Sequence, residues 1–93
     1  MPETFPLIVE RKGSIMTLRL NNVDKKNALN SEMMGAMAAS IKESQKFSNL
    51  RAIVIRGEGS VFCSGADLNE WQPHQLQQLL NEIVKCSLPT IAL

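Results

Sequence analysis

The stretch Val61-Phe62-Cys63-Ser64-Gly65-Ala66-Asp67-Leu68 decides the fold, because it leaves a β-rich run, turns on small residues and ends where a helix can begin. Gly65 and Ala66 have almost no side chain to cover their amides, and Gly65 can adopt dihedral angles closed to other residues. An oxygen atom of a ligand could therefore approach the backbone directly. Either this is an oxyanion-binding turn with the N–H of Ala66 as donor, or it is an ordinary tight turn, and the spacing alone leaves both open.

The residues before this stretch predict a small sheet. Residues 52–55 form a short apolar, β-branched run that predicts a strand over residues 52–56, closed by Gly57-Glu58-Gly59-Ser60. Farther upstream, residues 5–10 and 14–20 alternate in polarity around Lys12-Gly13, which predicts a hairpin. Strands of this kind can hold the turn rigidly.

Two helices are expected around these strands. Ser31 is the predicted N-cap of a helix running to about residue 45, with methionines 33, 34 and 37 at helical spacing as core residues. Pro73 can open a second helix, whose apolar stripe consists of Leu76, Leu79, Leu80, Ile83 and Val84. Leu88-Pro89 ends this helix, and residues 90–93 begin another strand. Because an apolar strand stands at the very end, we expect sequence of the same fold to follow it.

Composition excludes several classes of function. A chain of 93 residues makes one domain at most, residues 1–93, and its net charge of +1 favours neither nucleic acid nor anionic membrane as a partner. No apolar run approaches a membrane span, so we expect a soluble, cytoplasmic protein. Two cysteines and one histidine, without metal-ligand spacing, predict neither a disulfide framework nor a metal site.

Other candidate side chains have simpler interpretations. Lys25 and Lys26 could meet ligand phosphates or be solvated loop charges. Cys63 lacks a partner base and is expected to be a packing residue. Trp71 and His74 could cap a pocket, although a lone histidine beside a helix-starting proline is more often a surface or capping residue. Glu70 and Glu82 are available carboxylates, but nothing in the sequence identifies either as a general acid or base.

Three segments together resemble the enoyl-CoA hydratase/isomerase family, also called the crotonase family. They are Lys25-Lys26-Asn27-Ala28-Leu29-Asn30, the strand that ends Ile55-Arg56-Gly57, and Phe62-Cys63-Ser64-Gly65-Ala66-Asp67-Leu68. Each segment alone is weak evidence for the family, but the order and spacing of the three segments are specific to it. The resemblance spans nearly all of residues 5–93.

The resemblance implies an α/β fold, a spiral of repeated ββα units of which only the N-terminal part is present. It implies binding of acyl-CoA thioesters, with coenzyme A as part of the substrate and no separate cofactor, and an enolate held by two backbone N–H donors. Ala66 matches the first, catalytic donor. Positions matching the substrate site are Lys26, Ala28, Leu29, Ser64, Gly65, Asp67 and Leu68. Family members also form trimers and dimers of trimers, which implies a homo-oligomer.

The departures from the family pattern are informative too. The second donor and the acid and base glutamates of family hydratases match no residue here, so we expect this chain alone to be inactive. Asn22-Val23 stands where family members often have Arg-Pro, and the segment between Leu68 and Pro89 is shorter than usual. The alternative is a non-catalytic crotonase-like protein that binds coenzyme A or another subunit.

Overall fold

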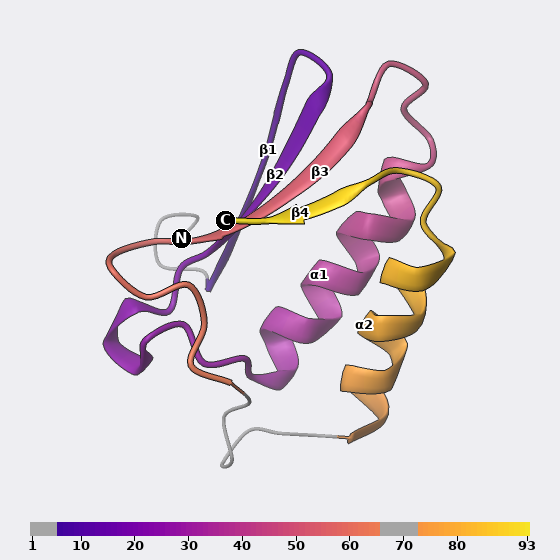
Figure 1. Cartoon of the computed structure of the whole chain (residues 1–93). Coiled ribbons are helices and arrows are strands. Elements are labelled where there is room, and N and C mark those ends of the chain that lie inside the picture. Colours follow the sequence, from indigo (N-terminus) through magenta and orange to yellow (C-terminus); the bar gives the residue numbers. More distant parts are fainter. Residues whose placement is uncertain (1–5, 66–72) are drawn as a thin grey trace.

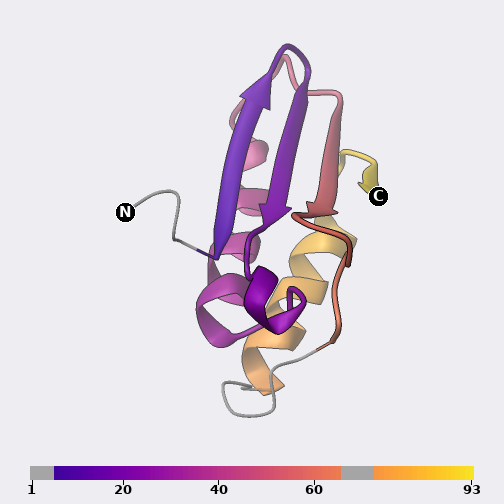
Figure 2. The same ribbon diagram turned by 90° about the vertical axis from the view of Figure 1, so that its left-hand side faces the viewer.

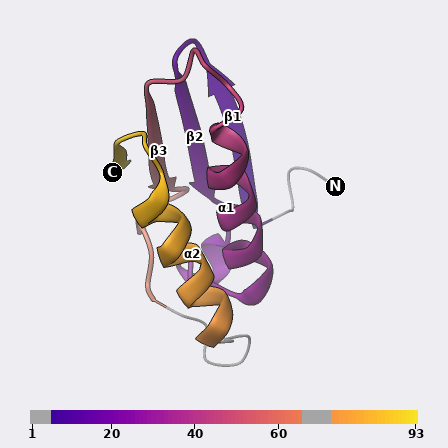
Figure 3. The same ribbon diagram turned by 90° about the vertical axis from the view of Figure 1, so that its right-hand side faces the viewer.

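Two helices cover one face of a four-stranded sheet in the computed structural model, which describes residues 6–65 and 73–93 (Figure 1). Figure 2, seen from the left-hand side of Figure 1, has the strands in front. Figure 3, seen from the right-hand side, has the helices in front. In these described ranges, no helix has the length and apolar character needed to cross a membrane. The elements in chain order are β1 (Leu7–Lys12), β2 (Ile15–Leu20), the 3-10 helix η2 (Val23–Lys25), α1 (Ser31–Ser44), β3 (Ala52–Gly57), α2 (Pro73–Lys85) and β4 (Thr90–Ala92).

The sheet has the order β1-β2-β3-β4, and its pairing combines both directions. β1 and β2 form the predicted antiparallel hairpin, with Lys12 opposite Ile15 next to the turn. β2 pairs with β3, and β3 with β4, in parallel. Because Leu20 lies opposite Gly57, β2 and β3 end side by side, and the loops that follow them start from the same edge.

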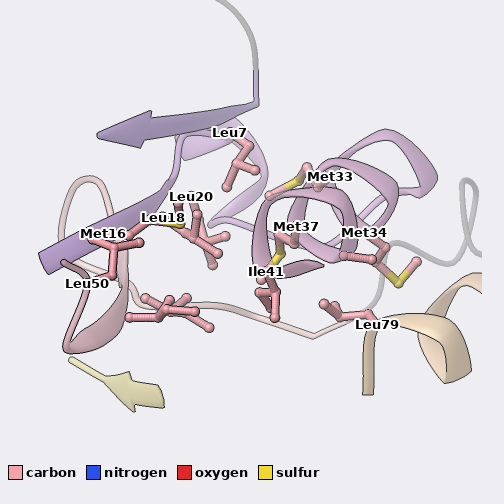
Figure 4. Packing of buried hydrophobic residues seen from close by; sticks show 13 residues of the cluster. Leu7, Met16, Leu18, Leu20, Met33, Met34, Met37, Ile41, Leu50 and Leu79 are labelled. Carbon is pink, nitrogen blue, oxygen red and sulfur yellow. The ribbon is translucent and has the colours of Figure 1, made fainter. Parts of the chain in front are cut away.

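The core lies between the sheet and α1. Alternate residues of β2 are buried, as expected for a strand with one covered face. Methionines at positions 33, 34 and 37 of α1 pack against them, which confirms the prediction that they are core residues (Figure 4). The buried side chains labelled in that view are Leu7, Met16, Leu18, Leu20, Met33, Met34, Met37, Ile41, Leu50 and Leu79.

The start of α1 corrects one prediction. Asn30, not Ser31, is the N-cap: its backbone is extended, with φ −102° and ψ 177°, and its side-chain oxygen accepts a hydrogen bond from the Met33 N–H at 2.8 Å. Ser31 is already inside the helix. Both residue types cap helices well, so backbone conformation rather than composition decides between them.

The apolar stripe of α2 is only partly buried. Leu79 is 3% exposed and belongs to the core, and Leu76 and Ile83 pack against it. Leu80 and Val84 are 51% and 82% exposed. β4 is an edge strand, so the described structure presents exposed apolar side chains on α2 and an open strand edge at β4.

From the exposed apolar side chains of α2 and the open edge of β4, we expect the chain to self-associate. Exposed apolar patches and open strand edges favour contact with other chains, so sedimentation velocity should show species larger than the monomer as concentration rises. The double variant Leu80→Glu/Val84→Lys should shift the distribution toward monomer. Gln77→Glu/Gln78→Lys introduces the same charges at exposed polar positions of α2 and should leave it unchanged. A wild-type chain that stays monomeric at high concentration would contradict the prediction.

The end of β3 is packed too closely for a side chain. A Cβ atom built on Gly57 would lie 2.5 Å from the Val61 carbonyl oxygen and 2.8 Å from Nδ2 of Asn27, and it would also strike the carbonyl oxygen of Phe62. Two of these three obstacles are backbone atoms, which cannot rotate away. The absence of a side chain at Gly57 therefore lets the following turn fold back over the strand.

Gly57→Ala should lower the free energy of unfolding by about 1–3 kcal/mol, since the new methyl must displace backbone. Gly35 is the matched control: it is exposed in α1, and its Cβ would have no neighbour within 4 Å. Gly35→Ala should raise the free energy of unfolding by about 0.5–1 kcal/mol, because alanine has less backbone freedom than glycine in the unfolded chain. Urea unfolding measures both, and equal midpoints for the two variants would show that the close packing at Gly57 has no energetic consequence.

Candidate functional site

Two loops meet at the edge where β2 and β3 end. We call residues 21–30 the lysine loop and residues 58–65 the small-residue turn. They leave the carboxyl ends of neighbouring parallel strands and lie side by side in two views (Figures 1 and 2). In open α/β sheets, ligands bind outside this end of the strands. The predicted site residues of both loops are thus brought together wherever the structure describes them.

The lysine loop is closed on itself by two asparagines. The Asn22 N–H donates to Oδ1 of Asn27 at 2.8 Å, and the Asn27 N–H donates to the Asn22 carbonyl oxygen at 2.8 Å. Nδ2 of Asn22 also donates to the Ala28 carbonyl oxygen at 3.0 Å. Lys26 and Asn27 both have positive φ, 53° and 59°, which turns the chain sharply between these bonds. The loop therefore has a fixed shape of its own.

A buried asparagine fastens this loop to the small-residue turn. Asn27 is 0% exposed, and its Nδ2 donates to the carbonyl oxygens of Glu58 at 2.9 Å and Val61 at 2.7 Å. A buried amide without partners would cost free energy, and here all three side-chain hydrogen bonds reach backbone groups. Asn27 is consequently a structural centre of the site.

Two further hydrogen bonds between described residues join the loops. The hydroxyl of Ser64 donates to the Lys25 carbonyl oxygen at 3.1 Å, and the Leu29 N–H donates to the Gly65 carbonyl oxygen at 2.7 Å. Gly65 has φ +109°, a conformation that favours glycine. The predicted positions Leu29, Ser64 and Gly65 are therefore in direct contact across the junction, and Ala28 lies beside them in the closed part of the lysine loop.

The remaining predicted positions of this stretch, Ala66, Asp67 and Leu68, lie outside the described residues. The same holds for Glu70 and Trp71. The oxyanion donor at Ala66 stays a prediction.

A pocket of about 200 Å³ opens beside the junction. Lys26 is exposed at this pocket, and within residues 6–65 and 73–93 its ammonium group forms no ion pair. The carboxylate of Glu58 is paired with Arg19 at 3.5 Å. Lys26 thus supplies positive charge that an anionic ligand could use. The lining residues are Val23, Lys26, Asn27, Glu58, Ser60 and Val61.

Of the other candidate side chains, Cys63 belongs to the small-residue turn, whereas His74 and Glu82 lie on α2. Cys63 is half-buried and packs against the core, as predicted for a packing residue. His74 is exposed in the first turn of α2, and Glu82 pairs with Lys85 at 3.9 Å. Among the residues described, no three His, Cys, Asp or Glu side chains gather as metal ligands.

Asn27 belongs to a sequence motif, but the motif predicts no role for it. A usable signal was present, since asparagine tolerates positive φ and often occupies tight turns, and Asn27 follows a polar turn directly. Its acceptors, however, lie 31 and 34 residues away, so spacing alone could not reveal them.

The sequence matches one protein family over most of its length. Residues 10–93 match the enoyl-CoA hydratase/isomerase family. A probable enoyl-CoA hydratase of Mycobacterium tuberculosis is 28% identical over 99% of this chain and 40% of its own length. The 1,2-epoxyphenylacetyl-CoA isomerase of Escherichia coli is 36% identical over 71% of this chain and 25% of its own length. The cyclohexa-1,5-dienecarbonyl-CoA hydratase of Thauera aromatica is 35% identical over 81% of this chain and 29% of its own length.

Solved structures agree with the family match. The Pseudomonas aeruginosa protein PA4980 superposes with a TM-score of 0.91 at 27% identity, over 99% of this chain and 45% of that one. A putative enoyl-CoA hydratase/isomerase from Acinetobacter baumannii gives a TM-score of 0.86 at 27% identity, over 95% of this chain and 40% of that one. The chain spans 25–40% of the length of the three curated relatives above. Its architecture is the N-terminal region of the crotonase fold, and the chain belongs to the enoyl-CoA hydratase/isomerase family.

Proposed function

We propose that this chain is the acyl-CoA thioester-binding portion of an enoyl-CoA hydratase/isomerase family enzyme, in which an oxyanion hole stabilises an enolate. The observation that carries the proposal is the junction of the lysine loop with the small-residue turn at the carboxyl ends of β2 and β3. Relatives whose names specify CoA esters as substrates support it, among them an isomerase and a hydratase.

The lysine loop would meet the coenzyme A portion of the substrate. Lys26 offers a flexible positive charge on the exposed side of the pocket, suited to a phosphate group that is not held in one fixed geometry. Ala28 and Leu29 have their backbone held in place by hydrogen bonds, so a ligand would meet a surface that needs no ordering.

The small-residue turn would meet the thioester. Ser64 and Gly65 bring the chain to the position from which Ala66, Asp67 and Leu68 continue, and the N–H of Ala66 is the proposed donor to the thioester oxygen. One preorganised oxyanion donor is typically worth about 2.7–4 kcal/mol in the transition state. Charge at this oxygen grows as the enolate forms, so the donor would favour the transition state over bound substrate.

Proton transfer needs a positioned acid and base, and among the described residues that line the pocket Glu58 alone carries a carboxylate. Glu58 is the carboxylate of the pocket, and it is engaged with Arg19. Glu82 lies on α2 and pairs with Lys85. The engagement of both glutamates supports our inference, for the described residues 6–65 and 73–93, that this part of the chain binds the thioester without converting it.

Calorimetric titration of the folded chain with acetyl-CoA should show binding, and Lys26→Ala should weaken it by about fivefold, the effect of losing one charge contact of roughly 1 kcal/mol. The affinity of the variant should also depend less on salt, because screening acts on the lost contact. Lys42→Ala removes an equal charge from an exposed position of α1 and should bind like wild type. Absence of binding by a folded sample, or equal losses in both variants, would refute the proposal.

The chain should not hydrate crotonyl-CoA above the uncatalysed rate. A single donor lacks both the second half of the oxyanion hole and a positioned acid/base pair, which together supply most of the rate enhancement in such a mechanism. Loss of absorbance of the conjugated thioester measures the reaction directly. Turnover at about 1 s⁻¹ or faster, a rate typical of enzymes, would show that the residues 1–93 contain the missing groups.

A further inference from the structure

We propose that Asn27 is a positioning residue: its buried carboxamide sets the separation between the lysine loop and the small-residue turn, and thereby the affinity for acyl-CoA. This inference rests on the proposed function, since it concerns the same site. It concerns a residue for which the sequence predicted no role.

Only a carboxamide of this length satisfies the three groups around it. Nδ2 carries two hydrogens, and each meets a carbonyl oxygen of the small-residue turn, at Glu58 and at Val61. Oδ1 accepts from the Asn22 N–H inside the lysine loop. One planar group thus holds both loops at once, and its two ends cannot be exchanged without placing oxygen against oxygen.

The surrounding backbone is built to admit this amide. Asn27 has φ +59°, which asparagine tolerates better than most residues. Nδ2 lies 2.8 Å from the position that a Cβ of Gly57 would occupy, so the missing side chain there provides the space. The amide and the glycine are therefore complementary, and a longer side chain at position 27 would not fit.

Within the described residues, the two other hydrogen bonds that join the loops are weaker because of their surroundings. The Ser64 hydroxyl bond to Lys25 is exposed, where water competes for both partners. The Leu29 bond to Gly65 joins backbone to backbone and requires the loops to be at the correct separation already. We therefore expect both to loosen when the buried amide is lost, while the core remains folded.

Asn27→Asp is the most direct variant. It preserves the shape and the acceptor for the Asn22 N–H but puts a carboxylate oxygen where Nδ2 donated, facing the carbonyl oxygens of Glu58 and Val61. Asn27→Gly is the second variant. It keeps the positive φ without strain and removes only the side-chain bonds, so it stays informative if the charged variant folds poorly.

Acetyl-CoA binding at a temperature where each variant is more than about 90% folded separates positioning from stability. Unfolding of a tenth of the molecules changes the apparent Kd by only about 1.1-fold. Positioning predicts weakening of about tenfold for both Asn27 variants. The matched control is Ile41→Val, a core change near the other end of α1, which lowers stability and should leave the affinity unchanged. Asn27 variants that bind within twofold of wild type, or a control with the same loss, would overturn the inference.

Two further readouts test the amide chemistry. For Asn27→Asp, affinity relative to wild type should recover in part as the pH falls from about 8 to about 5, because a protonated carboxyl can again donate one hydrogen bond. Asn27→Gly should show no such recovery.

Amide hydrogen exchange without ligand tests the fastening itself. The Leu29 N–H should exchange faster in both variants while amides of β2 and β3 keep their wild-type rates. Unchanged exchange at Leu29 would overturn the inference even if acetyl-CoA binds. A wild-type chain that fails to bind, combined with faster exchange at Leu29, would reject the proposed function and the control of affinity but retain the fastening role.

Discussion

The parallel register of β2 with β3 is the constraint on which the rest of the structure depends. With Leu20 opposite Gly57, two loops that are far apart in the sequence begin at one edge of the sheet. A slip of one residue would turn the buried face of β2 outward, since side chains alternate along a strand, and would also separate the loops. The register that buries Met16, Leu18 and Leu20 is thus the register that assembles the site. Packing and function are coupled through the same hydrogen-bonded strand pair.

The core and the site are stabilised by different forces. Sheet and α1 meet through apolar side chains, among them three methionines whose flexible, polarizable side chains fill irregular space. The junction of the loops contains polar contacts that are largely to backbone atoms, with the buried amide of Asn27 at its centre. Apolar packing tolerates changes of similar volume, whereas a satisfied polar network tolerates few changes of any kind. We therefore expect the site to be disturbed more by substitutions that change hydrogen-bonding groups than by substitutions that change side-chain volume.

Much of this architecture follows from sequence patterns, and the remainder depends on contacts that no local pattern contains. Alternation predicted the hairpin, and helical spacing placed the methionines in the core, because both depend on a single element having one covered face. The cap of α1 was assigned one residue too late, since Asn30 and Ser31 are both good caps and only backbone dihedrals distinguish them. Helical spacing also predicted the apolar stripe of α2, but spacing alone does not say that Leu79 is buried while Leu80 and Val84 are exposed, because burial depends on which neighbours are present. The two carbonyl oxygens that accept hydrogen bonds from the Asn27 side chain belong to another loop, so no local pattern around Asn27 contains them.

Asn22 shows how a departure from a family pattern can be accommodated. The resemblance led us to expect Arg-Pro where this chain has Asn22-Val23. Here the Asn22 side chain is directed inward, donating to the Ala28 carbonyl oxygen at 3.0 Å and lying 3.8 Å from Sδ of Met33. Its backbone N–H and carbonyl oxygen both bond to Asn27. An arginine would bring a charge that needs solvent or an acidic partner, whereas asparagine closes the loop with neutral hydrogen bonds. Because the hydrogen bonds of Asn22 close the lysine loop, Lys26 stays at the exposed side of the pocket. The lysine loop itself therefore supplies positive charge at this edge of the sheet.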